Sequence, residues 1–184
     1  MPNLSGYVLV SFPNIRKQEF QKSVVFIFHH GDEGAMGFFI NLPLQRQDWP
    51  EALENVILTS SGTMLWGGPS DMGRGFLLHS QDYFTEETLR IGENYGVSPA
   101  KETKNFTDLT LPQIFPQYTL TLIGYATWRS GQIEEELMNH DWIAMPATLK
   151  LIFEVAPIDK WDVALSMLNL PQDTVLTYYP GSVG

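Results

Sequence analysis

Cysteine is missing from the 184 residues of this chain. Without cysteine the protein has no disulfide, no thiol nucleophile, no iron–sulfur cluster and no zinc site built on thiolates. A long hydrophobic run at the N-terminus is missing as well. The apolar stretch at residues 6–12 is too short for a signal-peptide core or a membrane span. We therefore expect a cytoplasmic protein with no membrane partner.

Basic residues are scarce in the chain. Lys and Arg number 11 against 21 Asp and Glu, which gives a formal net charge of −10. Such a charge repels phosphate backbones, so direct binding of nucleic acid is disfavoured. The densest basic group, Arg16, Lys17 and Lys22 beside Phe12 and Phe20, is expected to form a solvated loop.

The common catalytic and phosphate-binding motifs are also absent. The chain contains no Gly-x-Ser-x-Gly elbow, no Walker A loop, no Gly-x-Gly-x-x-Gly and no His-Glu-x-x-His. Backbone N–H groups of a glycine-rich stretch can bind an anion, but no clear helix start follows the glycines of this chain. We interpret these glycines as tight turns: Gly67, Gly68, Gly73 and Gly75.

The residues that are present are sufficient for a packed core. A hydrophobic content of 43% and 12% aromatics, at this length, predicts one domain over residues 1–184. The first 80 residues have strand-like patterns, and the last 60 alternate strand and helix. The expected elements are a central strand at 23–30 covered on both faces, a hairpin through 31–33 into 34–41, a helix at 49–58 capped by Asp48, strands at 64–66 and 74–80, and a strand-like piece at 88–91 within the polar stretch 81–117.

A long strand is predicted at residues 119–128. Strict alternation would place Leu120, Leu122 and Trp128 on one face of this strand. Gly124 and Ala126 lie on the same face, and their small side chains leave room for another element to approach closely. The strand is therefore expected to contact a second segment near its middle.

Two amphipathic helices are predicted after this strand. Ser130 is expected to cap the first one, with Glu134 and Glu135 pointing away from the core. The residues expected on its buried side are Ile133, Leu137 and His140. Asp159 and Asp162 are expected to begin the second helix in a capping-box-like arrangement. Its apolar stripe is Trp161, Leu165 and Leu168.

The four histidines are the first candidates for chemistry. His29 and His30 are adjacent in a strand and point to opposite faces, so they do not readily share one ion, and we expect no metal site. His79 would lie beside His30 if their strands pair, although a hydrogen-bonded structural role is the simpler interpretation of His79. His140 is expected at the buried edge of its helix, paired with Glu136 one turn earlier.

A second set of candidates is a polar and aromatic cluster that joins the long strand to the first helix. Its members are Tyr125, Trp128, Arg129, Gln132 and Glu136. Gln132 and Glu136 are one helical turn apart and flank the apolar stripe, which places both at the rim of the core. The cluster is either an internal hydrogen-bond network or a groove for a peptide or small ligand, and the sequence leaves both possibilities open.

The same region carries a family resemblance. Within the block 124–142, residues 124–136 match the pattern Gly-Tyr-(Ala/Ser)-x-Trp-x-x-Gly-Gln-Leu-Glu-x-Glu, with Ile133 in the Leu position. Gly34–Gly37, Asn41–Pro43, Gly67–Pro69 and Arg74–His79 precede the block in order. The chain resembles the YqgE/AlgH family of bacterial proteins over essentially its whole length. One departure is the basic stretch Ile15–Phe20, where the family often has Leu-x-Asp-Pro-x-Phe.

The resemblance implies a fold but no reaction. The implied fold is α+β, with a mixed, largely antiparallel, bifurcated β-sheet curled into a partial barrel and helices packed outside. Members are labelled transcriptional regulators, and no catalytic residue or cofactor comes with the resemblance. Three functions therefore stay open: a non-catalytic binding or regulatory protein with a protein or small-molecule partner, which we favour; a hydrolase that uses His30 or His79 with a carboxylate; and a regulator that acts indirectly or by binding DNA.

Overall fold

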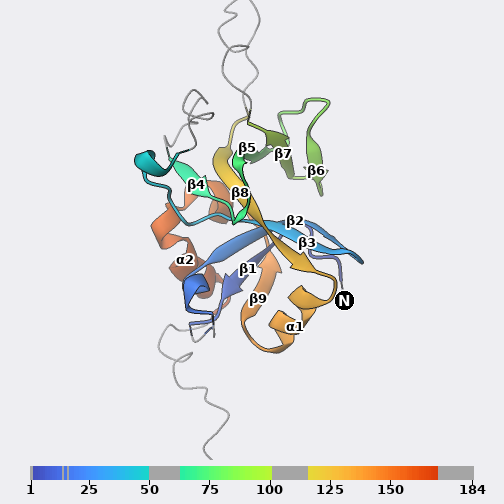
Figure 1. The fold of residues 1–184 in the computed structure, drawn as a ribbon, viewed down its shortest axis with the longest axis vertical. Coiled ribbons are helices and arrows are strands. Elements are labelled where there is room, and N and C mark those ends of the chain that lie inside the picture. Colours follow the sequence, from blue (N-terminus) through green and yellow to red (C-terminus); the bar gives the residue numbers. More distant parts are fainter. Residues whose placement is uncertain (1, 14, 16, 50–62, 101–115, 170–184) are drawn as a thin grey trace, which may run out of the picture.

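The computed structural model describes residues 2–13, 15, 17–49, 63–100 and 116–169. Nine strands of this part form one sheet (Figure 1). They are β1 (Tyr7–Ser11), β2 (Val24–Gly31), β3 (Gly34–Phe39), β4 (Met64–Trp66), β5 (Ser70–Ser80), β6 (Leu89–Ile91), β7 (Tyr95–Pro99), β8 (Thr119–Arg129) and β9 (Trp142–Pro146). The helical segments are the 3₁₀ turns η1 (Gln18–Phe20), η2 (Arg46–Asp48) and η6 (Pro157–Asp159), the π-helical turn η5 (Lys150–Glu154), and the α-helices α1 (Gln132–Met138) and α2 (Lys160–Met167).

The sheet is mixed, largely antiparallel and branched at β8. Its strand order is β6-β7-β5-β8-β3-β2-β1-β9, and β4 pairs with β8 in parallel outside this path. The first half of β8 lies between β5 and β4, whereas its second half pairs with β3 from Ala126 to Arg129. The strongly twisted sheet curls into a partial barrel, as the resemblance implied, with α1 and α2 packed against it (Figure 1).

Two hydrophobic clusters cover opposite faces of the sheet. On β2, Val24, Phe26 and Phe28 belong to one cluster, whereas Val25 and Ile27 belong to the other. The prediction of a central strand buried on both faces is therefore confirmed. The first cluster also holds residues of η5 and α2, and the second holds Ile133 of α1, so the two α-helices pack on different faces.

The alternation predicted for the long strand is wrong beyond its midpoint. Gly124 adopts a left-handed φ of 66°, and the register between β5 and β8 shifts between Ser70 and Gly75. The side chains after Gly124 consequently change faces: Leu120 and Leu122 belong to the first cluster, whereas Trp128 belongs to the second.

The close approach expected near Gly124 is confirmed. The backbone of Gly67 and Gly68 crosses β8 there, and a Cβ added at Gly124 would lie 2.4 Å from the carbonyl oxygen of Gly68. An added Cβ at Gly68 would lie 2.1 Å from the carbonyl carbon of Tyr125. These two glycines serve backbone packing, in keeping with the structural interpretation of the glycine-rich stretch.

The predicted helix starts are only partly correct. Gly131, with φ 76°, occupies the cap position of α1 in place of Ser130, and Asp159 makes no side-chain capping bond to α2. The stripe Trp161, Leu165 and Leu168 packs against the first cluster as expected.

The remaining strand predictions agree with the structure apart from shifts in several boundaries. The hairpin through residues 31–33 is formed by β2 and β3, and β4 has the expected bounds. β5 begins earlier than predicted, at Ser70. The strand-like piece at 88–91 contains β6, and its partner β7 was not predicted from the sequence. The helix predicted at 49–58 falls almost entirely outside the described residues.

Candidate functional site

Glu136 of α1 lies at the centre of the predicted polar cluster. Its Oε2 accepts hydrogen bonds from the indole nitrogens of Trp128, at 2.9 Å, and Trp142, at 2.8 Å. Its Oε1 accepts hydrogen bonds from the Nζ of Lys17, at 2.9 Å, and the Nε2 of Gln132, at 3.0 Å. The Glu136 carboxylate therefore receives four donors from four different parts of the chain.

Burial and hydrogen bonding act in opposite directions on Glu136. Burial of the residue, which is 8% exposed, raises the pKa of the carboxyl group, but the hydrogen bonds from Gln132, Lys17, Trp128 and Trp142 together outweigh it, so the net pKa is lowered. The prediction that Glu136 lies at the rim is wrong. The carboxylate is an ionised, fully occupied centre that joins α1, β8 and β9 to the loop before β2.

The other members of the predicted cluster divide into two groups. Gln132 belongs to the Glu136 network, and its Oε1 accepts a hydrogen bond from the backbone N–H of Arg129 at 3.1 Å. The Arg129 guanidinium is exposed and lies 4.0 Å from Glu135. Tyr125 lies apart from them, because the change of face at Gly124 packs it against the first hydrophobic cluster.

His30 has a partner at each ring nitrogen. Its Nδ1 accepts a hydrogen bond from the backbone N–H of Leu4 at 3.0 Å, and its Nε2 lies 3.0 Å from Oε1 of Glu134. Because Nδ1 accepts, Nε2 carries the proton when the ring is neutral and donates it to Glu134. The expectation that Glu134 points away from the core is wrong: this residue ties α1 to the end of β2.

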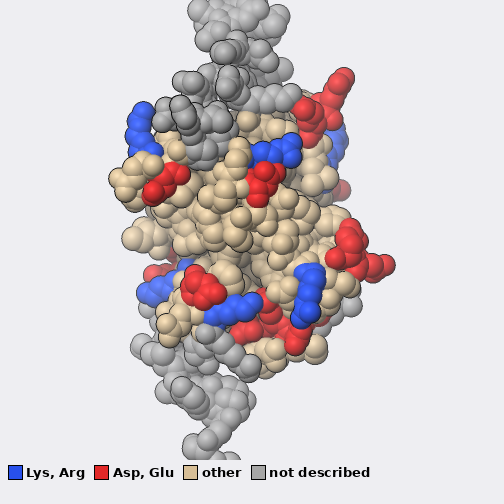
Figure 2. Space-filling model, in the orientation of Figure 1, with Lys and Arg blue, Asp and Glu red and all other residues tan. Residues whose placement is uncertain are grey.

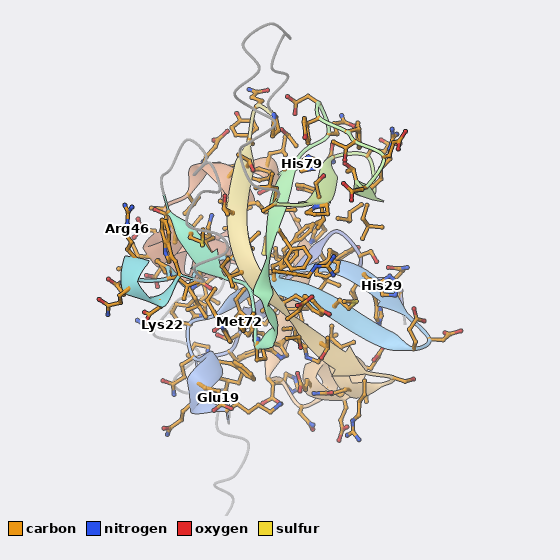
Figure 3. The ribbon with its side chains drawn as sticks, turned by 45° about the horizontal axis from the view of Figure 1, so that its top comes forward. Glu19, Lys22, His29, Arg46, Met72 and His79 are labelled. Atoms are coloured by element: carbon orange, nitrogen blue, oxygen red, sulfur yellow. The ribbon has the colours of Figure 1, made fainter. Side chains whose placement is uncertain are left out.

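His79 is buried in a separate network and does not approach His30. β5 and β2 are not neighbours in the sheet, and Figure 3 shows His79 well away from the β2–β3 hairpin that bears His29. His79 Nδ1 lies 2.9 Å from the carbonyl oxygen of Ser80, and Nε2 lies 2.9 Å from Oγ of Ser98. Burial lowers the pKa of His79 and favours the neutral ring. The hydrogen bond to Ser80 and the charge of Asp82 act in the opposite direction and only partly offset the effect of burial.

The last histidine prediction is wrong as well. His140 is exposed, follows the end of α1 and has a φ of 58°, so it does not pack at the buried edge of the helix. Its ring meets the edge of Phe12 at a centroid distance of 5.9 Å.

The described part of the chain has no group of three or more His, Asp or Glu side chains arranged to hold a metal ion. His29 is hydrogen-bonded to Glu33 at 2.7 Å, whereas His30 contacts Leu4 and Glu134.

The described members of the basic group predicted to form a solvated loop have partners within the protein. Lys17 pairs with Glu136, and the Nζ of Lys22 lies 5.4 Å from the ring centroid of Trp161. Arg16 is outside the described residues.

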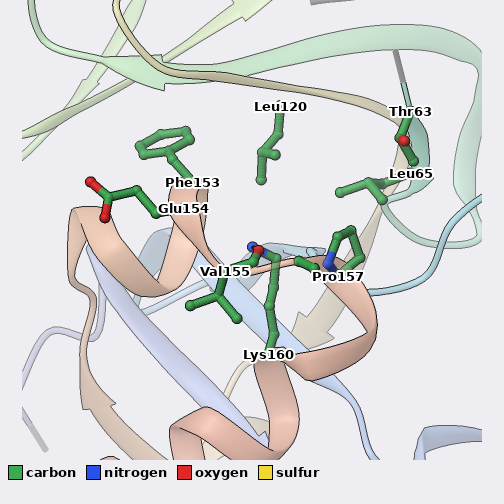
Figure 4. Close-up of a pocket in the computed structure, with 9 residues that line it drawn as sticks. Thr63, Leu65, Leu120, Phe153, Glu154, Val155, Pro157 and Lys160 are labelled. Carbon is green, nitrogen blue, oxygen red and sulfur yellow. Dashed lines mark hydrogen bonds between the residues drawn. The ribbon is translucent and has the colours of Figure 1, made fainter. Parts of the chain in front are cut away.

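The structure reveals a pocket that the sequence did not predict. It has a volume of about 270 Å³ and lies between the β4–β8 part of the sheet and the turn from η5 to η6 (Figure 4). Its mainly apolar lining is Leu65, Leu120, Phe153, Val155, Pro157 and Lys160, with Thr63, Glu154 and Ala156 also contributing. Isolated π-helical turns such as η5 occur frequently at functional sites.

Lys160 forms the floor of this pocket and is completely buried. Its Nζ donates hydrogen bonds to the carbonyl oxygens of Leu151, at 3.0 Å, Ile152, at 2.5 Å, and Val155, at 2.9 Å. Burial lowers the pKa of the amine to about 8. An ammonium has three hydrogens, and all three are used here, so Lys160 holds the η5 turn in shape and has no donor left for a ligand.

One sequence signal could have located Lys160. Ala164 and Leu165 are buried on α2, and Lys160 and Trp161 lie one turn earlier on the same side of the helix. A lysine at a core-facing helix position needs buried acceptors, which here are the carbonyl oxygens of η5. The pocket as a whole gave no such signal, because residues 63–65, 120 and 153–160 are far apart in the sequence.

Known proteins are similar to this chain over most of its length. A model of the AlgH-like family matches residues 8–172. A UPF0301 protein of Bradyrhizobium sp. is 34% identical over 180 residues, covering 91% of this chain and 82% of the relative. The UPF0301 protein YqgE of Salmonella newport is 30% identical over 192 residues, covering 99% of this chain and 98% of the relative.

Solved structures show the same fold. The solution structure of the AlgH protein from Pseudomonas aeruginosa matches with a TM-score of 0.71 at 27% identity, covering 98% of this chain and 96% of that one. A crystal structure of a Corynebacterium diphtheriae protein matches with a TM-score of 0.70 at 19% identity, covering 96% and 91%. On the family match over residues 8–172 and these relatives, the chain belongs to the AlgH-like family.

Proposed function

We propose that the protein is a non-catalytic binding protein and that it binds through the pocket between β8 and the η5–η6 turn. The observation that supports this proposal is a mainly apolar cavity of about 270 Å³. Ile158 follows the lining residue Pro157 in the sequence and, at 82%, is the most exposed of the large apolar side chains in the described part. Sites for drug-sized ligands measure about 300–1,000 Å³. The cavity is thus suited to one apolar group, such as a side chain of a protein partner, with Ile158 in the surrounding contact.

The geometry gives less support to a hydrolase. His79 and Ser98 are placed like a base and a nucleophile, 2.9 Å apart, but both are buried and Ser98 is also 2.7 Å from Oγ1 of Thr88. His30 is held between Leu4 and Glu134. A fluorophosphonate, which labels accessible activated serines, should leave the folded protein unmodified, and stoichiometric labelling of Ser98 would favour the hydrolase instead.

Direct DNA binding is also disfavoured. The net charge is −10, and on the face shown in Figure 2 the Lys and Arg side chains alternate with Asp and Glu. Proteins that bind DNA present a basic patch or stripe. A regulatory role, as the label of the family suggests, is therefore more consistent with binding to another protein than with binding to DNA.

In the described residues, no helix is long and apolar enough to cross a membrane.

A titration followed by two-dimensional amide NMR tests the proposed site. N-acetyl-L-phenylalaninamide offers one apolar side chain, and N-acetylglycinamide is the matched probe without it. The first probe is expected to shift the amide signals of Leu120, Val155 and Ala156, and the second is not. Ala156→Trp, at the exposed edge of the pocket, should abolish the shifts, whereas Ser166→Trp, exposed on α2, should preserve them. Equal responses to both probes, or unchanged binding by Ala156→Trp, would overturn the proposal.

A further inference from the structure

The pocket has an acidic residue fixed at its edge. Oε1 of Glu154 accepts a hydrogen bond from the hydroxyl of Tyr118 at 3.1 Å, and the carboxylate raises the pKa of the phenol. The Tyr118 ring in turn stacks on Phe153, which lines the pocket, with ring centroids 5.6 Å apart. Figure 4 shows the Glu154 carboxylate beside Phe153 and directed away from the centre of the cavity. Glu154 is therefore held at the edge of the pocket without filling it.

This carboxylate has no cationic partner in the described part of the chain. Lys160 is the nearest basic residue in the lining, and all three of its hydrogens are bonded to backbone carbonyl oxygens. Lys150 lies four residues before Glu154 and is exposed, yet no ion pair joins them. Asp159, also exposed, adds a second negative charge to the same turn. Glu154 at the edge of the pocket and Asp159 on η6 are therefore two carboxylates without an ion-pair partner among the described residues.

We propose that the partner is a protein segment in which an apolar side chain, the anchor for the pocket, stands next to a Lys or Arg that pairs with Glu154. This inference rests on the proposed function and adds the charge of the partner to it. Complementary charge at the rim of an interface raises the association rate and excludes wrong partners, here acidic or phosphorylated segments. The exposed Ile158, which follows the lining residue Pro157, fits a contact larger than one small molecule.

Three synthetic peptides test the proposal on the full chain: Ac-Gly-Lys-Leu-Lys-Gly-NH2, its acidic counterpart with Glu in place of Lys, and a basic control with Ser in place of Leu. Dissociation constants would be measured by NMR titration at low and high salt. We expect the basic Leu peptide to bind most tightly, and its advantage over the acidic peptide to shrink as salt is added.

Variants separate charge from cavity. Glu154→Gln keeps the shape and can still accept the Tyr118 hydrogen bond, and it should weaken the basic Leu peptide by about two- to fivefold, the usual range for an exposed ion pair. Glu135→Gln makes the same change of net charge on α1, which packs on the other face of the sheet, and should have no effect. Loss of binding by Ala156→Trp tests the pocket independently of charge.

The outcomes distinguish the two claims. If the basic and acidic Leu peptides bind equally and Glu154→Gln has no effect, the charge assignment is overturned while the pocket remains. If the Ser and Leu peptides bind equally, or Ala156→Trp binds as the wild type does, the proposed function fails as well. Tighter binding of the acidic Leu peptide contradicts the partner class directly.

Discussion

At the scale of single residues, the carboxylate of Glu136 is the centre of the motif at residues 124–136. A carboxylate that accepts hydrogen bonds from Trp128, Trp142, Lys17 and Gln132 has no free acceptor positions facing a ligand. Removing it would leave two buried indole N–H groups unpaired. The network therefore acts as a joint between α1, β8 and β9.

Glu136→Ala is predicted to lower the free energy of unfolding by about 2–4 kcal/mol, because each orphaned buried donor costs about 1–3 kcal/mol. The matched control is Glu135→Ala, where the side chain is exposed, and its effect should stay within about 0.5 kcal/mol. Urea unfolding at neutral pH measures both. If Glu136→Ala lowers the free energy of unfolding no more than the control does, the motif is not needed for stability, and a role as a ligand site would be favoured instead.

The buried His79 should make the stability of the fold depend on pH. Burial lowers its pKa below the ordinary value of 6.5, so the unfolded chain binds more protons than the folded chain as the pH falls through that value. The stability of the wild type should therefore decrease on acidification from about pH 7 to pH 5, and level off once the folded ring is also protonated. His79→Gln should show a shallower dependence than His140→Gln, in which an exposed ring is replaced; equal slopes would contradict this account of His79.

At the scale of secondary-structure elements, the crossing of Gly67–Gly68 over β8 decides which face each half of β8 presents. The left-handed Gly124 at this crossing carries the close contact with the Gly68 carbonyl. A side chain there meets two obstacles, an unfavourable φ and a backbone atom that cannot move aside.

Gly124→Ala and Gly131→Ala separate these two obstacles. Gly131 has a similar φ of 76° but open space around it, so its alanine variant should lose about 1–2 kcal/mol from the backbone conformation alone. Gly124→Ala should lose more than about 3 kcal/mol, because the clash with Gly68 adds to the same conformational cost. Thermal unfolding of the pair checks this, and similar losses in both variants would mean that the crossing is not tightly packed.

Lys160 determines the shape of the η5 turn. Lys160→Met keeps much of the side-chain volume but leaves two buried carbonyl oxygens and one partly buried one without this donor, and we expect a loss of about 3–5 kcal/mol. Lys150→Met, exposed at the start of the same turn, should change stability by less than about 0.5 kcal/mol. Chemical denaturation compares the two; a small effect of Lys160→Met would show that water replaces the ammonium.

At the scale of the whole molecule, the sequence predicted what depends on local pattern. The apolar run at 23–30 indicated a doubly covered strand, and the short loop at 31–33 indicated its hairpin; both are present as β2 and β3. The fold class followed from the motifs that the chain shares with its family. The strand and its hairpin are encoded by neighbouring residues, so one sequence is enough to find them, whereas the fold class needed the family resemblance.

Features that depend on distant segments were not predicted. The change of face at Gly124 requires Gly68 to cross β8, and Glu136 receives Lys17 from 119 residues away. Its burial could not be inferred from helical spacing alone, because the buried face of α1 is set by Trp128 and Trp142 of two different strands. The pocket is likewise assembled from separated segments of the chain, of which Lys160 alone left a recognisable trace.

The central claim is that binding takes place at the η5–η6 pocket and not at the Trp128–Glu136 network. Paramagnetic broadening by the basic Leu peptide carrying a nitroxide label tests it most directly, since broadening falls off with distance from the label. We predict strong loss of the amide signals of Leu120, Val155 and Ala156, with the indole signals of Trp128 and Trp142 preserved. Loss of the two indole signals with the pocket amides unaffected would contradict the account and move the binding site to the motif.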